Sequence, residues 1–282
     1  MVSKLFSSAG LLLTLFFFSN DCFSKSAPNN RVLITAVTGA FGTAISKQLA
    51  SEGYNLVLAG RNPVKLQALK TTLQQQFPSI EIDSVFIDFS KDHAAKIPST
   101  GKAYAKPLTG IVLIGPRPFI AKQGNPATSE WVRVFEETFT APLAVINAFQ
   151  HNLVEEGSVV VISGNSSINY LPSYRNTNNY RMLWVSEVKN LAQSFGARKI
   201  RVNAISPGII MTQHHIDRLH AKAARNNASF KQQVTDDASD IPLGRFGQVE
   251  DVAHLCSFLL SSKSKHINAV NIPLDGGENR AY

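Results

Sequence analysis

Short apolar segments alternate with segments of helical periodicity along most of the chain, and this alternation constrains the fold more than any other feature. Apolar residues recur at helical spacing at Leu66, Leu69 and Leu73, and again at Val188 and Leu191. The apolar segments between such helices have the length and composition of strands covered on both faces, and they comprise Val32–Thr35, Asn55–Ala59, Ile82–Ile87, Gly110–Ile114, Ser158–Ser163, Arg201–Ser206 and Ala269–Leu274. We therefore predict an α/β fold, a single doubly wound parallel sheet with helices on both faces.

The composition is that of an ordinary globular protein and excludes several classes of function. The chain has 282 residues, of which 44% are hydrophobic and 17% charged, enough apolar material for a sizeable core. The formal net charge is +8, but the basic residues are scattered, with Arg198, Lys199 and Arg201 the nearest approach to a cluster. Because the sequence has no basic stripe interleaved with aromatic residues, we predict no nucleic-acid partner and expect a small-molecule substrate.

The N-terminus has the pattern of a secretory signal peptide over residues 1–24. Lys4 precedes an apolar run at 11–18, and a polar region of small residues follows up to Ser24. The run is short for a bilayer-spanning helix, so we predict cleavage after Ser24 and export of residues 25–282 to the periplasm or the exterior. An uncleaved anchor that holds the domain at a membrane is the alternative, and this leader is the only membrane contact we expect.

Cysteine and histidine spacing indicates neither a disulfide framework nor a metal site. Cys22 lies in the leader, and Cys256 lies in an apolar helical pattern, where we predict a core position. His214, His215 and His220 form a group in sequence, but no acidic or cysteine partner has fitting spacing, so we predict no metal.

The segment Arg31–Ser46 has the order strand, tight turn and helix, with small residues in the turn. This order brings backbone N–H groups and the positive end of a helix dipole to one point, which suits the pyrophosphate of a dinucleotide. Gly39 and Gly42 let the chain bend and let a phosphate approach the backbone. The turn is poor in glycine, so the prediction depends on the rest of the chain.

Towards its C-terminus the chain resembles the short-chain dehydrogenase/reductase family in long, ordered matches. They are Ile200–Gly208 followed by Thr212, Ile241–Gly247, Glu250–Ala253 and Leu274–Gly277, and the whole resemblance covers about residues 31–279. It implies a Rossmann-like fold and hydride transfer between a nicotinamide cofactor and a carbonyl or alcohol. The resemblance places Pro207, Gly208 and Thr212 beside the nicotinamide.

The family's cofactor signature, Thr-Gly-x-x-x-Gly-x-Gly, falls on residues 35–42. The resemblance assigns cofactor binding there to Thr35, Gly39, Phe41 and Gly42. Two of the three glycines are replaced by Ala36 and Ala40, whose methyl groups stand where the backbone must bend or approach phosphate. We expect Gly39 to take over part of the bending.

Residues that follow the next strands indicate which nicotinamide cofactor is bound. Arg61 stands where an acidic residue would accept hydrogen bonds from a ribose 2′-hydroxyl, and its guanidinium suits a 2′-phosphate instead. NADP is therefore favoured over NAD. Asp88 matches the family's adenine-contacting acid, with a turn or capping role as the alternative. The family's fourth strand ends in Asn-Asn-Ala-Gly, whereas this chain has Ile114–Pro118 there, with two prolines that stiffen the loop. The resemblance assigns Gly115 of this segment to the cofactor site.

Four residues carry catalysis in this family: a proton-donating tyrosine, a lysine beside it, a serine that binds the substrate oxygen, and an asparagine that supports a water relay. In an ungapped register these positions hold, in the same order, Thr177, Arg181, Gly164 and Thr138. None of the four expected residue types is present there.

Substitutes lie close by in the sequence. Tyr174 and Arg181 resemble the wider tyrosine-to-lysine spacing of the divergent enoyl-reductase branch, although an arginine does not shuttle protons. Tyr180 and Ser167 keep the family's tyrosine-to-serine spacing, but Trp184 then falls where lysine is needed. We predict catalytic roles for Tyr180, Tyr174, Arg181 and Ser163, and packing at the pocket mouth is the alternative for the tyrosines.

Two functions remain open from the sequence. The first is an NADP(H)-dependent oxidoreductase that acts on a small carbonyl or alcohol, with the polar, helical stretch Thr212–Asp240 as a lid over the substrate. The second is a catalytically inactive protein of the same fold that binds a nucleotide or another anion. By analogy with the family, a homo-oligomer is expected.

Overall fold

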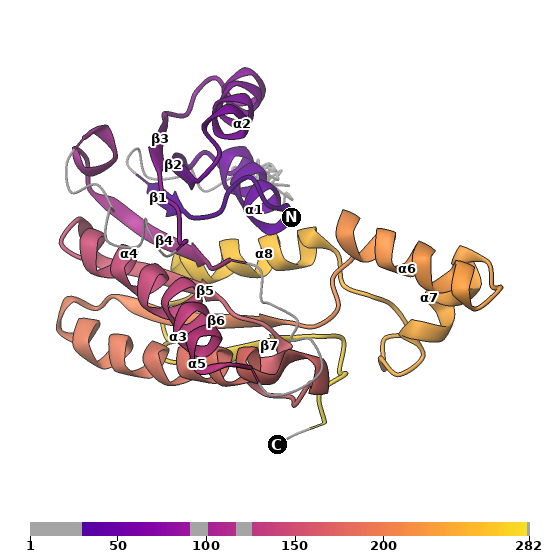
Figure 1. The fold of residues 1–282 in the computed structure, drawn as a ribbon. Coiled ribbons are helices and arrows are strands. Elements are labelled where there is room, and N and C mark those ends of the chain that lie inside the picture. Colours follow the sequence, from indigo (N-terminus) through magenta and orange to yellow (C-terminus); the bar gives the residue numbers. More distant parts are fainter. Residues whose placement is uncertain (1–29, 91–100, 117–125, 281–282) are drawn as a thin grey trace, which may run out of the picture.

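The computed structural model describes residues 30–90, 101–116 and 126–280, which contain one seven-stranded parallel sheet (Figure 1). The strands lie in the order β3-β2-β1-β4-β5-β6-β7. Their bounds are β1 (Arg31–Ile34), β2 (Asn55–Gly60), β3 (Ile82–Phe86), β4 (Leu108–Ile114), β5 (Leu153–Ile162), β6 (Arg201–Pro207) and β7 (Asn271–Leu274). The chain winds outward from β1 to β3 and then the other way from β4 to β7, so the predicted doubly wound sheet is confirmed.

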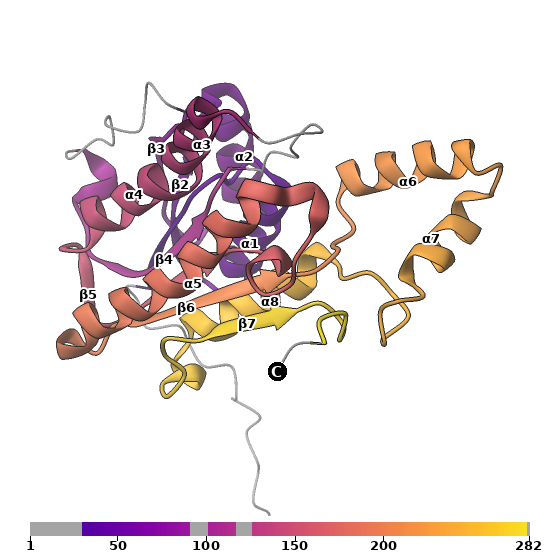
Figure 2. The same ribbon diagram turned by 60° about the horizontal axis from the view of Figure 1, so that its bottom comes forward.

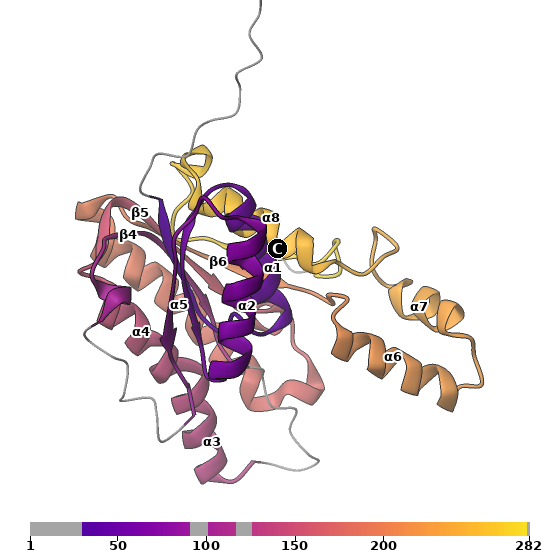
Figure 3. The same cartoon turned by 90° about the horizontal axis from the view of Figure 1, so that it is seen from above.

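Helices cover both faces of this sheet (Figure 3). One face carries α1 (Ala40–Ser51), α2 (Pro63–Gln76) and α8 (Val249–Leu260). The other face carries α3 (Thr128–Phe135), α4 (Ala141–Phe149) and α5 (Arg175–Phe195). A π-helical turn at Glu136–Thr140 joins α3 to α4, and two short 3₁₀ turns, Asn165–Ser167 and Pro172–Tyr174, lie between β5 and α5.

The helices cover these faces because each has an apolar stripe of the predicted period. Leu49 of α1 and Cys256 of α8 are fully buried on one side of the sheet, which confirms the predicted core position of Cys256. Phe149 of α4 and Val188 of α5 are buried on the other side. Each fully buried apolar side chain of this size stabilises the fold by about 1.5–3 kcal/mol relative to an exposed one.

The strand boundaries differ from the prediction by more than one residue in three strands: β4, which begins at Leu108 rather than Gly110, β5 and β7. β5 begins at Leu153, where it pairs with Leu108 of β4 before a register irregularity, so it is longer than the predicted segment. β7 begins at Asn271, later than predicted, because Ala269 has a φ of +61°, which interrupts an extended strand.

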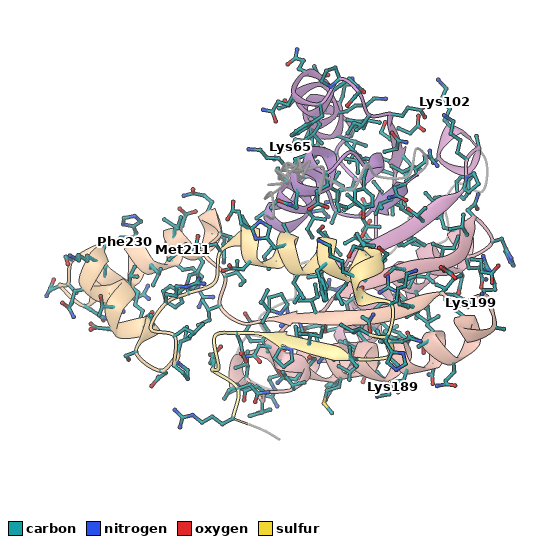
Figure 4. All side chains as sticks on the ribbon, turned by 180° about the vertical axis from the view of Figure 1, so that it is seen from behind. Lys65, Lys102, Lys189, Lys199, Met211 and Phe230 are labelled. Carbon is teal, nitrogen blue, oxygen red and sulfur yellow. The ribbon has the colours of Figure 1, made fainter. Side chains whose placement is uncertain are left out.

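The stretch that follows β6 projects from the body of the molecule as two helices, α6 (Gln213–Arg225) and α7 (Phe230–Ala238) (Figure 2). They enclose a small apolar cluster of their own, built around buried Leu219 and Phe246. Met211 and Phe230 lie on this projection and pack against that cluster (Figure 4). The helical character of the stretch is as predicted, and its role as a lid stays a prediction.

Within the described ranges, the structure has no helix both long and apolar enough to traverse a bilayer. The predicted leader, residues 1–24, lies outside the described residues.

Candidate functional site

The predicted site residues follow the carboxyl ends of the strands, and the centre of this edge lies between β1 and β4, where the winding direction reverses. Ligands of open α/β sheets bind at such a point. Thr35 closes the edge here. Its hydroxyl donates to the carbonyl oxygen of Ile114 at 2.9 Å and accepts from the amide of Ile114 at 2.7 Å. Thr35 is fully buried, so its side chain ties β1 to β4 beneath the turn.

The turn from β1 into α1 bends at Ala36, which has a φ of +48°. Gly39 has a φ of −87°, which any residue adopts, so the expectation that Gly39 takes over the bending is wrong. The expected glycine is absent at Ala36, but the left-handed backbone conformation that a glycine favours there is retained. Such a conformation costs a non-glycine residue about 1–2 kcal/mol.

The first turn of α1 keeps its backbone N–H groups free of side-chain capping. Gly39 is the N-cap residue and no side chain hydrogen-bonds to the end of the helix, while Gly39 and Ala40 are both exposed. Phe41 is partly buried against the core. A helix start of this kind, open to solvent and uncapped, leaves donors and a positive dipole end for an anion.

Gly42 lets α1 pack directly on this turn. A methyl group at Gly42 would lie 2.5 Å from Cα of Val37 and 2.6 Å from the carbonyl oxygen of Ala36. Both neighbours are backbone atoms, so the contact tolerates only glycine.

Arg61 lies at the end of β2, beside the same turn. The amide of Val37 donates to the carbonyl oxygen of Ala59 at 3.1 Å, which joins the turn to β2 two residues before Arg61. Arg61 is exposed, and it forms no ion pair within the part of the chain that the structure describes. A cation is therefore presented next to the uncapped start of α1.

Asp88 and Gly115 follow β3 and β4 at the same edge of the sheet. A carboxylate oxygen of Asp88 accepts a hydrogen bond from the amide of Ser90 at 3.0 Å, which is the turn role given above as its alternative. Among the described residues, the nearest atom to a methyl group at Gly115 would be the carbonyl oxygen of Thr138 at 4.0 Å.

Arg181 and Gly164 occupy the centre of the predicted catalytic region. A methyl group at Gly164 would lie 2.5 Å from Cζ of Arg181 and within 2.8 Å of both terminal nitrogens. The guanidinium thus fills the space that a side chain at position 164 would need. It donates to Oγ of Ser166 at 2.9 Å, and Cζ lies 5.5 Å from the centre of the Tyr174 ring. Burial lowers the pKa of Arg181 to about 10, so the group stays charged at neutral pH.

Tyr180 is buried, unlike Tyr174, and packs away from this guanidinium. Its hydroxyl donates to the carbonyl oxygen of Trp131 at 2.6 Å, and its ring contacts Trp131 edge-on and Phe135 at a tilt. Burial raises the pKa of Tyr180, which disfavours the phenolate. These contacts join α5 to α3. Tyr170 is 73% exposed and lines a surface groove of about 520 Å³ with Trp131.

Ser163 and Trp184 complete the set of predicted catalytic positions. The hydroxyl of Ser163 is buried and has no hydrogen-bond partner among the described residues. Trp184, at the position where one register places the lysine, donates from its indole nitrogen to the carbonyl oxygen of Thr138 at 2.9 Å. It thereby holds the π-helical turn against α5.

The structure adds Ser166, Asn165 and Glu278 to the candidate site, and the sequence pattern did not single out Asn165 or Glu278. The Asn165 side chain donates to a Glu278 carboxylate oxygen at 3.1 Å across 113 residues of sequence. That oxygen would lie 3.1 Å from a methyl group at Gly208, so the C-terminal segment closes over the end of β6. Burial, and then the charge of Asp275, raise the pKa of Glu278.

The remaining predicted residues lie where β6 leads into the projection. Pro207 ends β6, and Gly208 packs so tightly that a methyl group there would lie 2.7 Å from Cβ of Asp275. The Thr212 side chain caps α6 by accepting from the amide of His215. His215 itself contacts the Phe246 ring edge-on, and burial lowers its pKa.

Comparison with known proteins agrees with this architecture. The family model described as Enoyl-(Acyl carrier protein) reductase matches residues 36–279. Levodione reductase of Leifsonia aquatica is 26% identical over 274 residues, which cover 92% of this chain and 99% of that protein. L-sorbose reductase of Gluconobacter frateurii, solved with NADPH and L-sorbose, superposes with a TM-score of 0.82 at 20% identity and covers 90% of this chain and 98% of that one.

A short-chain oxidoreductase of Pseudomonas aeruginosa PAO1 is similar as well. Its NADPH-bound structure, described as containing an atypical catalytic center, superposes with a TM-score of 0.79 at 20% identity over 90% of this chain and all of that one. The family model covers far more than half of the chain, and the fold agrees with it along the same span. The protein is therefore a member of the short-chain dehydrogenase/reductase family, a family of oxidoreductases.

Proposed function

We propose that the protein is an NADP(H)-dependent oxidoreductase that reduces a small carbonyl compound or oxidises the corresponding alcohol. The observation that carries this proposal is the exposed Arg61 guanidinium beside the uncapped, solvent-open start of α1. The donors of that helix start suit the pyrophosphate, and Arg61 suits the 2′-phosphate that distinguishes NADP from NAD. The similar L-sorbose reductase and the Pseudomonas protein were both solved with NADPH.

The residues of the chain fit this cofactor at several of the points where they would hold it. Gly42 lets α1 approach the turn, and Thr35 fixes β1 against β4 below it. Gly115, Pro207 and Gly208 lie at the strand ends where a nicotinamide would lie, and among the described residues no atom would come closer than 4.0 Å to a methyl group at Gly115. When bound, the reduced cofactor supplies a hydride.

Tyr174 is the proton donor that we assign to the reaction. As a carbonyl carbon gains a hydride, its oxygen becomes an alkoxide and takes the phenolic proton of Tyr174, and solvent later returns a proton to the phenolate. Arg181 lies over the Tyr174 ring and supplies a fixed positive charge beside that phenolate. Tyr180 is unsuited to this role because its hydroxyl already donates to Trp131.

The test is a fluorescence titration of the protein with NADPH and with NADH, followed by a panel of carbonyl compounds. We expect Arg61→Ala to weaken NADPH affinity about ten- to hundredfold, since a charged hydrogen bond contributes roughly 1.5–3 kcal/mol, and to leave NADH affinity unchanged. Arg225→Ala, an exposed arginine on the projecting helix α6, is the matched control and should change neither. Equal losses for both cofactors with Arg61→Ala would refute the 2′-phosphate role.

A catalytically inactive nucleotide-binding protein is the second candidate. It is favoured by the four family catalytic positions, which hold Gly164, Thr177, Arg181 and Thr138. Tight NADPH binding without turnover of any carbonyl in the panel would support this candidate. Turnover that is lost in Tyr174→Phe and kept in Tyr180→Phe would support the enzyme.

We further propose that residues 1–24 direct export, as their n-, h- and c-region order indicates. The N-terminal sequence of the mature protein tests this directly. A mature protein that begins at residue 25 supports cleavage, whereas an intact N-terminus in the membrane fraction supports the anchor.

A further inference from the structure

We propose that Arg181 is the anion-binding residue of the substrate site, and that the substrate is a carbonyl compound that carries a carboxylate. The Arg181 guanidinium, which itself occupies the space beside Gly164, would hold this carboxylate through the N–H groups that it does not donate to the protein. The proposal rests on the proposed oxidoreductase function and names the substrate class of the same site.

The positive charge of Arg181 has no counter-ion among the described residues. The Arg181 guanidinium lies largely away from solvent, yet its polar neighbours are neutral: the hydroxyl of Ser166 and the ring of Tyr174. No carboxylate of the described residues forms an ion pair with it. A charge buried without a counter-ion is costly, and a bound anion removes this cost.

Most of the N–H donors of the Arg181 guanidinium have no acceptor among the described residues. A guanidinium has five N–H groups in a planar fork that matches a carboxylate. Only Nη1 has a hydrogen-bond acceptor among the described residues, the Ser166 hydroxyl, so Nη2 and Nε remain available. By contrast, the buried Arg31 donates to Asp83 and to three backbone carbonyl oxygens, as a purely structural arginine should.

The Arg181 guanidinium lies at the carboxyl edge of the sheet, beside Gly164. Gly164 follows the carboxyl end of β5, on the edge of the sheet where ligands of this fold bind. Because position 164 has no side chain, the guanidinium lies directly against its backbone, with both terminal nitrogens within 2.8 Å of the missing Cβ. The adjacent Ser163 hydroxyl is buried without a partner among the described residues, so it offers a further donor.

The nearby acidic groups are held elsewhere. Glu278 accepts from Asn165, the residue that follows Gly164, and lies over Gly208. Asp275 accepts from the backbone amides of Gly277 and Asn279 in its own turn. Neither forms an ion pair with Arg181, which leaves the guanidinium for a ligand.

The experiment compares carboxylates with uncharged counterparts on the full chain. A panel of 2-oxo and 3-oxo acids, each paired with its methyl ester, is reduced with NADPH by the wild-type protein and by Arg181→Met, Arg181→Lys and Arg225→Met. We expect wild type and the exposed control Arg225→Met to prefer the acids at least tenfold in kcat/KM. Arg181→Met should lose that preference through a higher KM for the acids, and kcat should fall for acids and esters alike because the charge beside Tyr174 is lost, while NADPH affinity is unchanged. Arg181→Lys should keep part of it.

A second measurement needs no turnover. Oxamate, an unreactive carboxylate, and oxamide, its neutral counterpart, are added to the protein with NADPH and the Tm is recorded. Oxamate should raise the Tm of wild type and not that of Arg181→Met, and oxamide should raise neither. Gly164→Ala keeps arginine at position 181 but displaces its guanidinium, so the rise in Tm caused by oxamate should be smaller than in wild type.

The outcomes separate this proposal from the proposed function. Equal kcat/KM for acids and esters, or an oxamate effect that survives in Arg181→Met, would overturn the anion-binding role even if NADPH is bound and used. An oxamate effect that depends on Arg181 in a protein without turnover would uphold the anion site and refute the oxidoreductase.

Discussion

Gly164 and Arg181 are sterically complementary, because the Arg181 guanidinium occupies the space in which a side chain at Gly164 would begin, 2.5 Å from its Cβ position. We predict that Gly164→Ala displaces the guanidinium and weakens the Ser166 hydrogen bond. The free energy of unfolding should fall by about 1–3 kcal/mol, because Gly164 has a φ of +158°, a backbone conformation that alanine rarely adopts, while the displaced guanidinium is the far end of a flexible side chain. Chemical denaturation measures this, and a loss above about 3 kcal/mol would show that the guanidinium is fixed in place.

Gly42 is crowded by backbone atoms, whereas Gly164 is crowded by the end of a side chain. The atoms that an added methyl would meet, at 2.5 and 2.6 Å, belong to Val37 and Ala36 and move only with the whole turn. We predict that Gly42→Ala lowers the free energy of unfolding by about 2 kcal/mol or more. Gly196→Ala is the matched control, since no atom of the described residues lies within 4 Å of a methyl group there, and it should stay within about 1 kcal/mol of wild type.

Ala36 bends the turn between β1 and α1 at the expense of backbone strain. Its φ of +48° is one that glycine adopts without strain. Ala36→Gly relieves this strain but also increases the conformational entropy of the unfolded chain. We predict that the free energy of unfolding rises by a net amount of roughly 0.5–1 kcal/mol. Ala44→Gly, inside α1, should lower it by about 1 kcal/mol, and the opposite signs are the diagnostic result. A loss of stability in Ala36→Gly would contradict the strain.

Tyr180 serves packing between α5 and α3. We predict that Tyr180→Phe lowers the free energy of unfolding by about 1 kcal/mol, because the 2.6 Å hydrogen bond to Trp131 is lost while the ring contacts remain. NADPH affinity and kcat should not change. Tyr170→Phe, with a side chain that is 73% exposed, should stay within about 0.5 kcal/mol. A fall in kcat greater than about tenfold in Tyr180→Phe would return this phenol to the catalytic role.

Glu278 should make stability depend on pH. Burial and Asp275 raise its pKa above the ordinary value of 4.5, so the folded protein holds this proton more tightly than the unfolded chain does. The stabilisation is fully present below that ordinary pKa and is lost as the pH rises through the raised one. We therefore predict that Glu278→Gln gains Tm relative to wild type as the pH increases from about 4 to about 8.

Glu187→Gln is the matched control for this measurement. Glu187 also accepts a hydrogen bond from an asparagine amide, that of Asn190, but on the exposed surface of α5. Its Tm difference from wild type should be the same across that pH range. If the Tm difference between Glu278→Gln and wild type does not grow with pH, burial does not destabilise the charged form of this carboxylate.

The fold could be predicted from the sequence because its signals are local, whereas cofactor binding at the carboxyl edge of the sheet stays a prediction. The apolar stripe of α1 and the small residues before it lie within one segment, Arg31–Ser46, and strands covered on both faces are apolar throughout. The bend at Ala36 was missed because a sequence shows where glycine is absent and does not show that alanine adopts the same φ.

The sequence by itself determined a doubly wound parallel sheet, since the spacing of the apolar residues determines which faces of the helices and strands are buried. Only the tertiary structure decided which side chains meet at the carboxyl edge of this sheet. Arg181 lies against Gly164, Tyr180 reaches Trp131, and Glu278 reaches Asn165 across 113 residues. These contacts join segments that are separate in the chain. Steric fit and burial determine which tyrosine hydroxyls, guanidiniums and carboxylates make them, and a local sequence pattern contains neither kind of information.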